Sequence, residues 1–269
     1  MRRFRRSVAA WLEGALLTIP LAAAVIGPLL AGSARSQAAP LQPPDPAHLF
    51  GTDVLGRDVL SLALTGGTSV LLLAGVALLL AYLVGVPLAL VAAGQRRRWV
   101  DETLLRALDV VLALPGLLVL LVLAATGRQG TGALVVAVAA LQLPPVVRLA
   151  RGAALAPGCR TAVEAMTMQG EPWWRIHFGY VGRSVLAPVL VDAGSRLSLV
   201  LYLVASANFL GLGLAPTTSD WAVLVDRNQE ALFLQPLAVV VPVLLLVALC
   251  TGINLVADRA LASRNGVRA

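Results

Sequence analysis

The chain contains no lysine, although it has 269 residues and 21 basic side chains, all of which are therefore arginine. This absence excludes chemistry that needs a lysine amine, including the P-loop lysine that binds phosphates and Schiff-base catalysis. Charge is also scarce, since charged residues make up 13% of the chain and hydrophobic residues 58%. A soluble domain has roughly 25% charged and 45–50% apolar residues. The composition therefore excludes a soluble enzyme and a disordered chain, and it indicates an integral membrane protein.

Cysteine and histidine are nearly absent as well. The two cysteines, Cys159 and Cys250, form no C-x-x-C pair, and the only histidines are His48 and His177. Structural metal and haem sites need several such side chains at close spacing. We therefore expect neither a metal site nor a cofactor in this chain.

Long apolar runs are abundant. A membrane-spanning helix needs about 20 consecutive apolar residues. Six stretches come close to that length, at 8–31, 68–94, 108–126, 132–150, 193–212 and 236–257. None alternates as a barrel strand would, and the first is longer than the apolar core of a cleaved signal peptide. The prediction is an all-α membrane protein with six spans, in which 1–67 holds the first helix and an outer segment and 68–269 forms a five-helix core.

Arginine is distributed unevenly among the connecting segments. It concentrates at both termini and in the segments after the second and fourth spans, whereas the other connections hold only Arg35, Arg57, Arg128 and Arg227. Because arginine is enriched in cytoplasmic loops, six spans place both termini in the cytoplasm. The net charge of +7 is thus a topology signal, and we expect the lipid bilayer, not a nucleic acid, as the surrounding partner.

Two segments on the predicted outer side are more than short loops. The first, 32–67, begins with several prolines and continues as Phe50-Gly-Thr-Asp-Val-Leu-Gly-Arg-Asp58. Gly51 and Gly56 permit turns, Thr52 or Asp53 can cap a following helix, and Arg57 and Asp58 can tie the segment to itself or to a neighbour. A folded outer element is expected, with a structural role or with substrate contact. The second segment, 213–235, predicts a re-entrant or surface-lying helix with Trp221 at the membrane–water boundary.

The longest inner segment, 151–192, forms the predicted cytoplasmic elbow. Pro157 and Gly158 end the fourth span, a short helix over 160–169 follows, and Pro172 then suits the first turn of another helix. The aromatic residues after Pro172 fit either the membrane surface or the groove of a soluble partner. The sequence alone leaves both interpretations open.

Polar residues inside the predicted spans are few. Glu13 and Asp109 lie near cytoplasmic span ends, where arginines can pair with them, so no carboxylate is expected at the centre of a span. The fifth span carries a polar stripe at steps of three and four residues, formed by Ser195, Ser198, Tyr202 and Ser206. Such a stripe either packs against another helix or lines a path. No catalytic constellation is present, so a membrane-embedded enzyme is not favoured.

Two motifs resemble one known family. Phe50-Gly-Thr-Asp-Val-Leu-Gly-Arg-Asp-Val-Leu-Ser61 is similar to the signature of the dipeptide/oligopeptide/nickel permease family of ABC importers, and specifically of its C-type dipeptide permease subunit. Phe209-Leu-Gly-Leu-Gly213, with Pro216 and Trp221 after it, resembles the same family's stretch between the last two spans. The resemblance implies the type I importer permease fold.

The family also carries a cytoplasmic EAA segment, which here resembles Glu164-Ala165-Met166, then Gly170, then Trp174-Arg175-Ile176. In the family this helix docks into the ATP-hydrolysing subunit, and the resemblance implies that these residues couple to it. Two positions depart from the pattern. Met166 replaces the third alanine, and Gly182-Arg183 replaces the closing Leu-Pro.

The resemblance implies a non-catalytic subunit of an ATP-driven importer in the cytoplasmic membrane of a bacterium. Its implied partners are a second permease subunit, giving a heterodimer, two ATPase subunits that hold ATP and Mg²⁺, and an extracytoplasmic binding protein. The implied cargo is a di- or oligopeptide, with nickel, haem or another small solute as the alternative. An ion-coupled secondary transporter is the competing function class.

Overall fold

The computed structural model describes residues 2–31, 38–95, 98–126, 130–215 and 218–266, with the backbone alone for 2–13, 98, 100 and 260–266. Apart from one isolated antiparallel bridge between Thr52 and Asp58, these ranges form helices joined by loops. The elements are α1 (Arg2–Leu30), α2 (Val59–Thr65), α3 (Gly67–Gly94), α4 (Arg98–Ala113), α5 (Gly116–Ala125), α6 (Thr131–Ala154), α7 (Pro157–Met168), the π-helical η1 (Arg175–Val181), α8 (Gly182–Phe209), α9 (Trp221–Asn228), η2 (Gln229–Ala231) and α10 (Leu237–Gly266).

Four helical segments are long and apolar enough to cross a membrane: Val59–Gly94, Thr131–Ala154, Arg175–Phe209 and Leu237–Arg259. A fifth candidate is the bent pair Asp101–Ala113 and Gly116–Ala125, and Gly14–Leu30 is a shorter apolar helix. The described residues therefore form an all-helical membrane protein with four candidate spans, or five when the bent pair counts as one. Some of the arginines on which the predicted topology depends, such as Arg35, Arg96 and Arg128, lie outside the described residues.

The predicted continuous span over 108–126 is wrong in shape. Its two halves, α4 and α5, meet at an angle of 76°. The break falls at Pro115, which has an extended backbone with φ −60° and ψ 122°. Proline lacks a backbone N–H and disfavours a helical conformation in the preceding residue, so the helix stops at Ala113 and restarts at Gly116.

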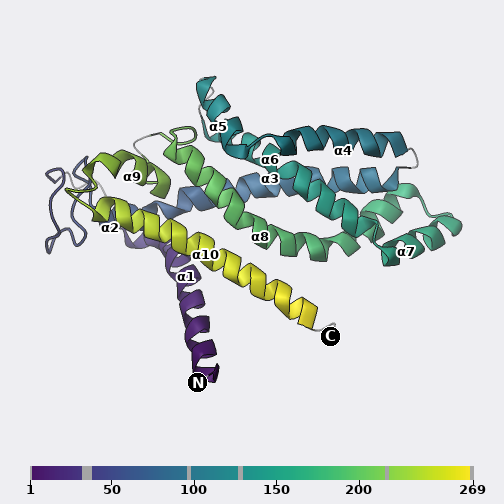
Figure 1. Ribbon diagram of the computed structural model, residues 1–269, viewed down its shortest axis with the longest axis horizontal. Coiled ribbons are helices and arrows are strands. Elements are labelled where there is room, and N and C mark those ends of the chain that lie inside the picture. The colour runs from purple at the N-terminus through teal and green to yellow at the C-terminus, as the bar shows by residue number, and fades with distance from the viewer. Residues whose placement is uncertain (1, 32–37, 96–97, 127–129, 216–217, 267–269) are drawn as a thin grey trace.

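The helices form an elongated bundle, in which the α3–α4 and α6–α7 connections lie at one end and the α1–α2 and α8–α9 connections at the other (Figure 1). α3, α4 and α6 run along the bundle, and α8 and α10 cross it. The loop that precedes α2 gathers with α9 at one end, whereas α7 projects at the opposite end. The two ends can therefore make contacts with different partners.

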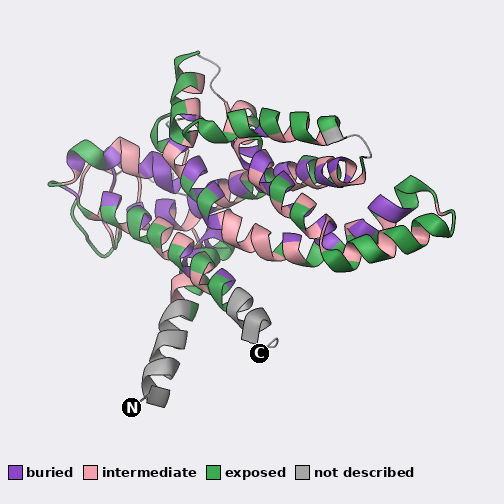
Figure 2. Cartoon of the chain, turned by 45° about the vertical axis from the view of Figure 1, so that its right-hand side comes forward, coloured by how far each residue is buried: buried purple, intermediate pink, exposed green. Residues whose placement is uncertain are grey.

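Two apolar clusters hold the bundle together. The larger joins α3, α6, α8, α9 and α10, and includes Val70, Leu134, Leu201, Trp221 and Leu249. The smaller lies toward the α7 end, where Leu90, Val147 and Val185 pack. Many large apolar side chains outside these clusters remain exposed, among them Leu79 and Leu83 of α3 (Figure 2). Such exposure suits a lipid environment, because lipid tails solvate apolar side chains as water does not.

Candidate functional site

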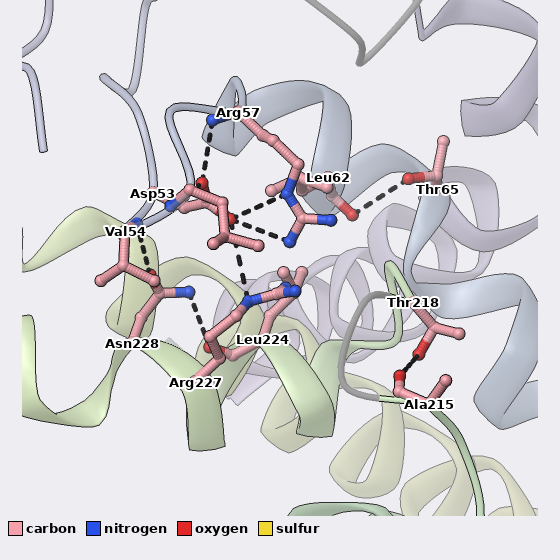
Figure 3. A network of polar contacts seen from close by, with 11 residues as sticks. Asp53, Val54, Arg57, Leu62, Thr65, Ala215, Thr218, Leu224, Arg227 and Asn228 are labelled. Atoms are coloured by element: carbon pink, nitrogen blue, oxygen red, sulfur yellow. Dashed lines mark hydrogen bonds and ion pairs between the residues drawn. The ribbon is translucent and has the colours of Figure 1, made fainter. Parts of the chain in front are cut away.

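The loop that precedes α2 is folded around one buried carboxylate. We call residues 38–58 the outer lip. Asp53 is fully buried, and its Oδ1 accepts the backbone N–H groups of Leu55 and Arg57, both at 2.8 Å. Its Oδ2 accepts Nε and Nη2 of Arg57 at 3.0 and 2.9 Å (Figure 3). Two charge-assisted hydrogen bonds from one guanidinium to a single oxygen hold Arg57 against Asp53, so the expectation that Arg57 ties the segment to itself is confirmed.

The other motif residues shape the turns of the lip. Gly51 and Gly56 have φ of +72° and +74°, a region that side chains with a Cβ rarely adopt. A Cβ on Gly51 would also lie 1.8 Å from Nε2 of Gln235. The buried Thr52 donates from Oγ1 to Ala39 O and accepts the N–H of Gln42.

The residue that caps α2 differs from the prediction. Thr52 and Asp53 were the expected capping residues, but Asp58 performs this role, accepting the Ser61 N–H at 2.8 Å. The side chains of Thr52 and Asp53 instead form hydrogen bonds within the turns of the lip. Oδ1 of Asp58 also lies 3.4 Å from Nδ1 of His48, so Asp58 links the middle of the lip to the start of α2.

Two residues of α9 join the lip to the rest of the molecule. Oδ1 of Asn228 accepts the Val54 N–H at 3.1 Å, and its Nδ2 donates to Leu224 O. Arg227 Nε lies 3.9 Å from Oδ2 of Asp53 (Figure 3). Burial and the neighbouring Arg57 charge lower the pKa of Arg227, while Asp53 opposes that shift. The sequence analysis missed these contacts, because nothing in the local pattern pairs Val54 with a residue so distant in the chain.

The interfacial position expected for Trp221 is wrong. Trp221 is fully buried, and its Nε1 donates to Ala63 O at 2.7 Å. The indole thus finds a polar partner inside the protein, which removes its reason to lie at the membrane surface. The neighbouring Asp220 caps α9 through the Ala222 N–H, and Ser69 donates to its Oδ2 at 2.7 Å.

At the opposite end, α7 forms the predicted elbow helix. Pro157 lies in its first turn, and none of its residues is buried. Glu164 and Ala165 are exposed and Met166 is half-buried. The helix ends before Gly170, whose φ of +78° reverses the chain. Glu164, Ala165 and Met166 therefore lie together on an open helix.

The residues after Gly170 divide between surface and anchor. Trp174 and Arg175 are exposed, and Arg175 pairs with Glu171 at 3.1 Å. Ile176 is only 2% exposed, so it belongs to the base of the elbow and not to the surface that carries Glu164. The sequence grouped Ile176 with the exposed residues because the π-helical turn of η1 was not foreseen.

A stacked aromatic pair fixes the elbow to α3. Trp173 and His177 stack with ring centroids 4.7 Å apart. Nε1 of Trp173 donates to Gly94 O at 3.1 Å, and Nδ1 of His177 donates to Trp173 O at 3.0 Å. A small cavity of about 150 Å³ lies between η1 and α7 and reaches Arg160, Glu164 and His177. The elbow is thus held at its base and open along its length.

The four residues of the predicted polar stripe share one groove between α8 and α10. The groove has a volume of about 530 Å³ and is lined by Ser195, Ser198, Tyr202, Ser206, Cys250, Thr251 and Asn254, with apolar residues between them. Ser198 donates to Cys250 O at 3.1 Å, so this hydroxyl joins the two helices. Tyr202 is exposed. One stripe residue thus packs helices together, while the others face open space.

The sequence analysis expected no carboxylate at the centre of a span and did not consider Asp192. Asp192 lies inside the candidate span Arg175–Phe209, where its Oδ2 accepts the hydroxyl of Tyr82 at 2.6 Å and pairs with Nε of Arg196. The predicted span began at residue 193, one residue too late to include it. An acidic and a basic residue four positions apart were the signal that could have revealed the pair. The ion pair expected for Asp109 is present, with Arg148 as partner, whereas the side chain of Glu13 lies outside the described residues.

Within the part of the chain that the structure describes, no three His, Cys, Asp or Glu side chains are grouped so that they could hold a metal ion. Cys159 and Cys250 are both free thiols. The structural features together define a class, namely a helical membrane protein with a folded lip at one end, an exposed elbow at the other and a polar groove between them.

Comparison with known proteins identifies the family. The model of the binding-protein-dependent transport system inner membrane component matches residues 85–263, and the chain belongs to this family. It is 31% identical over 216 residues to the glutathione transport system permease protein GsiD of Pectobacterium atrosepticum, covering 80% of this chain and 71% of that one.

Two further relatives cover more of the chain. The probable D,D-dipeptide transport system permease protein DdpC of Escherichia coli is 29% identical over 268 residues, covering 95% of this chain and 90% of that one. The dipeptide transport system permease protein DppC of Alkalihalophilus pseudofirmus is 27% identical over 246 residues, covering 90% and 81%. The resemblance inferred from the two sequence motifs is thereby confirmed.

Membership of this family defines the role of the chain. It is a multi-pass inner membrane permease component of a binding-protein-dependent ABC transporter. It is not an enzyme and, as in the family generally, carries no cofactor of its own. Transport therefore depends on ATP-hydrolysing subunits and on a substrate-binding protein.

Proposed function

We propose that this chain forms one half of the path of an ATP-driven importer of di- or oligopeptides, paired with a different permease subunit. The relatives support the substrate class, since their names refer to glutathione, D,D-dipeptides and dipeptides. The groove adds physical support. Its polar lining is hydroxyl and amide groups with one thiol, and nickel and other soft metals favour sets of imidazole, thiolate or thioether ligands. Nickel, haem or another small solute remains the alternative cargo.

The proposed topology has six spans with both termini in the cytoplasm, the first span being α1 and the third the bent pair of α4 and α5. The α3–α4 and α6–α7 connections lie at the α7 end, whereas the α1–α2 and α8–α9 connections lie at the lip end, which supports this arrangement (Figure 1). The outer lip then faces the binding protein, and α7 faces the ATPase. The exposed arginines Arg160 and Arg175 lie at the α7 end, as the distribution of positive charge in membrane proteins requires.

The observation that carries the proposal is the exposure of α7 at the end opposite the lip. A short helix with no buried residue, held firmly at its base by Trp173 and His177, can transmit a force from a soluble partner. Glu164, Ala165 and the turn at Gly170 would enter the groove of the ATPase. Met166 is larger than the alanine of the family pattern, so the matching groove must be wider at that position.

The mechanism follows from this placement. ATP binding closes the two ATPase subunits and moves both elbows, and the connected helices η1 and α8 carry the movement into the bundle. Ser195, Tyr202 and Ser206 line the path that this movement opens alternately to either side. The second permease subunit supplies the facing wall.

The proposal is tested by purifying the tagged chain in mild detergent from its native host and identifying the chains that copurify. We expect an ATPase subunit and a second permease. Glu164→Lys places a charge of the wrong sign on the exposed face, and Gly170→Asp adds a Cβ and a negative charge at a left-handed turn, which has φ of +78°. Both variants should lose the ATPase and ATP-dependent uptake while retaining the second permease.

Glu102→Lys is the matched control, because Glu102 is an exposed glutamate of α4 outside the elbow. It should copurify with all partners and support uptake. Normal uptake by both elbow variants would contradict docking through α7. Purification of the wild-type chain with copies of itself alone would contradict the heterodimeric importer.

A further inference from the structure

The groove-facing stripe of α8 continues to a charged residue. Asp192, Ser195, Leu199, Tyr202 and Ser206 follow one another at steps of three, four, three and four residues. Side chains at these steps share one face of a helix, and the last four of them line the groove. Asp192 therefore stands on the same face, one turn beyond the Ser195 end of the groove.

The carboxylate of Asp192 is held from two sides. Tyr82 of α3 donates its hydroxyl to Oδ2 at 2.6 Å, and Arg196 of α8 donates Nε to the same oxygen. The side chains of Arg196 and Asp192 keep 18% and 15% of their exposure. The ion pair is thus partly open, and both hydrogen bonds described for Asp192 fall on one of its two oxygens.

A contribution to folding stability does not by itself explain the ion pair of Asp192 and Arg196. A buried ion pair can often be replaced by apolar side chains at no cost, because removing two charges from water offsets their mutual attraction. Charged residues inside membrane spans are rare and generally mark substrate or ion pathways. Here the α3–α8 contact already has an apolar core that includes Val70, Ala74 and Val200.

Polarity increases along the groove from the outer end inward. The outer part, about 400 Å³ in volume, is lined mainly by apolar residues such as Phe209, Val225 and Val243. The next part carries the hydroxyl and amide groups of Ser195, Tyr202 and Asn254. Asp192 and Arg196 follow. A solute that moves inward therefore meets its first ion pair after the groove, near the middle of the span.

We propose that Asp192 is a specificity-determining residue of the path, where its carboxylate binds the ammonium group of a passing peptide or similar zwitterionic cargo. Tyr82 and Arg196 hold the carboxylate in place until the cargo arrives. This inference rests on the proposed function, since it assumes that the groove belongs to the path. Tyr82 and Arg196 both donate to Oδ2 of Asp192. An ammonium group, which donates up to three hydrogen bonds, can therefore bind the second oxygen, Oδ1, without displacing either of them.

The test uses the complete complex in proteoliposomes, with the ATPases, the second permease and the binding protein, and a peptide that the wild type imports. Asp192→Asn should lower the maximal uptake rate about tenfold, the effect of losing one charge-assisted hydrogen bond. ATP hydrolysis stimulated by the loaded binding protein should remain within about twofold of wild type. Asp192→Glu should restore uptake in part, because it retains the carboxylate, and Asp192→Gln should not.

A neutral double variant guards against misfolding. Asp192→Asn with Arg196→Gln leaves no unpaired charge in the span and should show the same loss of uptake with retained hydrolysis. The control is Asp101→Asn with Arg151→Gln, because this pair of α4 and α6 is also partly buried and lies outside the groove. It should transport like the wild type.

Three results overturn the inference. Unchanged uptake shows that cargo does not use Asp192. A parallel loss of uptake and ATP hydrolysis, or failure of both Asp192→Asn and the neutral double variant to assemble, shows that the pair is structural. Absence of ATP-dependent import by the wild type is a separate outcome, which refutes the proposed function and this inference with it.

Discussion

At the scale of single residues, the Asp53 side chain accepts four hydrogen bonds within the outer lip. Its carboxylate is fully buried and accepts hydrogen bonds from two backbone N–H groups and from the Arg57 guanidinium. Asp53→Asn removes the buried carboxylate charge that accepts the two Arg57 hydrogen bonds, and breaking a buried ion pair costs about 3 kcal/mol. We expect a lower unfolding temperature in detergent and faster proteolytic cleavage within residues 38–58.

Glu230→Gln is the control for this prediction, since Glu230 is exposed at the same end of the molecule and surface substitutions usually change stability by less than about 0.5 kcal/mol. Equal protease resistance of wild type and Asp53→Asn would show that the lip does not depend on this carboxylate.

The same residues show what local sequence can predict. The Asp53–Arg57 pair was foreseeable because the two residues are four positions apart and flanked by turn-forming glycines. The contacts of the lip with Asn228 and Gln235 were not foreseeable, because they join parts of the chain that are close only after folding. The prediction for Trp221 was wrong for a related reason. Its partner, Ala63 O, is a backbone carbonyl that no composition signal identifies.

At the scale of elements, the N-cap of α9 is Asp220, a carboxyl group whose charged form is disfavoured by burial. Burial raises the pKa of Asp220 above its usual value near 4, although Ser69 and the Ala222 N–H partly offset that shift. The unfolded chain therefore loses this proton at a lower pH than the folded chain does. As the pH rises from about 4 through the folded pKa, the wild type loses stability relative to a variant that cannot ionise there.

Asp220→Asn provides that comparison. We expect the unfolding temperature of the variant, relative to wild type, to rise as the pH increases from about 4 through the raised pKa of Asp220, and to level off above it. Contributions from other groups are common to both proteins and cancel in the difference. A difference that stays constant with pH, or that favours the wild type as the pH rises, would contradict a raised pKa at this cap.

Element boundaries explain the main error of the sequence analysis. Hydropathy placed the helices well, because long apolar runs have few alternatives in a membrane, and the elbow helix matched its proline and glycine signals. The same method gives no boundary for a helix that continues into polar sequence. η1 and α8 extend to Arg175, so Asp192 falls inside a span that composition alone placed further on. The bend at Pro115 was hidden because proline is tolerated within membrane helices.

At the scale of the whole molecule, packing contacts and chain connections link the two ends to the groove. The lip is joined to α9, α9 packs against α8 and α10, and the groove lies between these two helices. From the other end, η1 connects the elbow directly to α8. α8 is therefore the element through which an event at either end reaches the groove, and its exposed stripe is where the consequence should be measured.

Cys250 is a native probe of that consequence. Its side chain lines the groove, and the only other cysteine, Cys159, can be removed by Cys159→Ser. If the groove is part of an alternating path, a water-soluble maleimide should modify Cys250 in the assembled complex in one nucleotide state and not in the other. Leu244→Cys with both native cysteines replaced by serine is the control, because Leu244 is an exposed apolar residue of α10 outside the groove. That thiol should face lipid and resist the reagent in both states, since maleimide modification needs a hydrated thiolate. Equal modification of Cys250 in both states, whether complete or absent, would mean that access to the groove does not change with the nucleotide state, and the alternating path would then have to run elsewhere in the heterodimer.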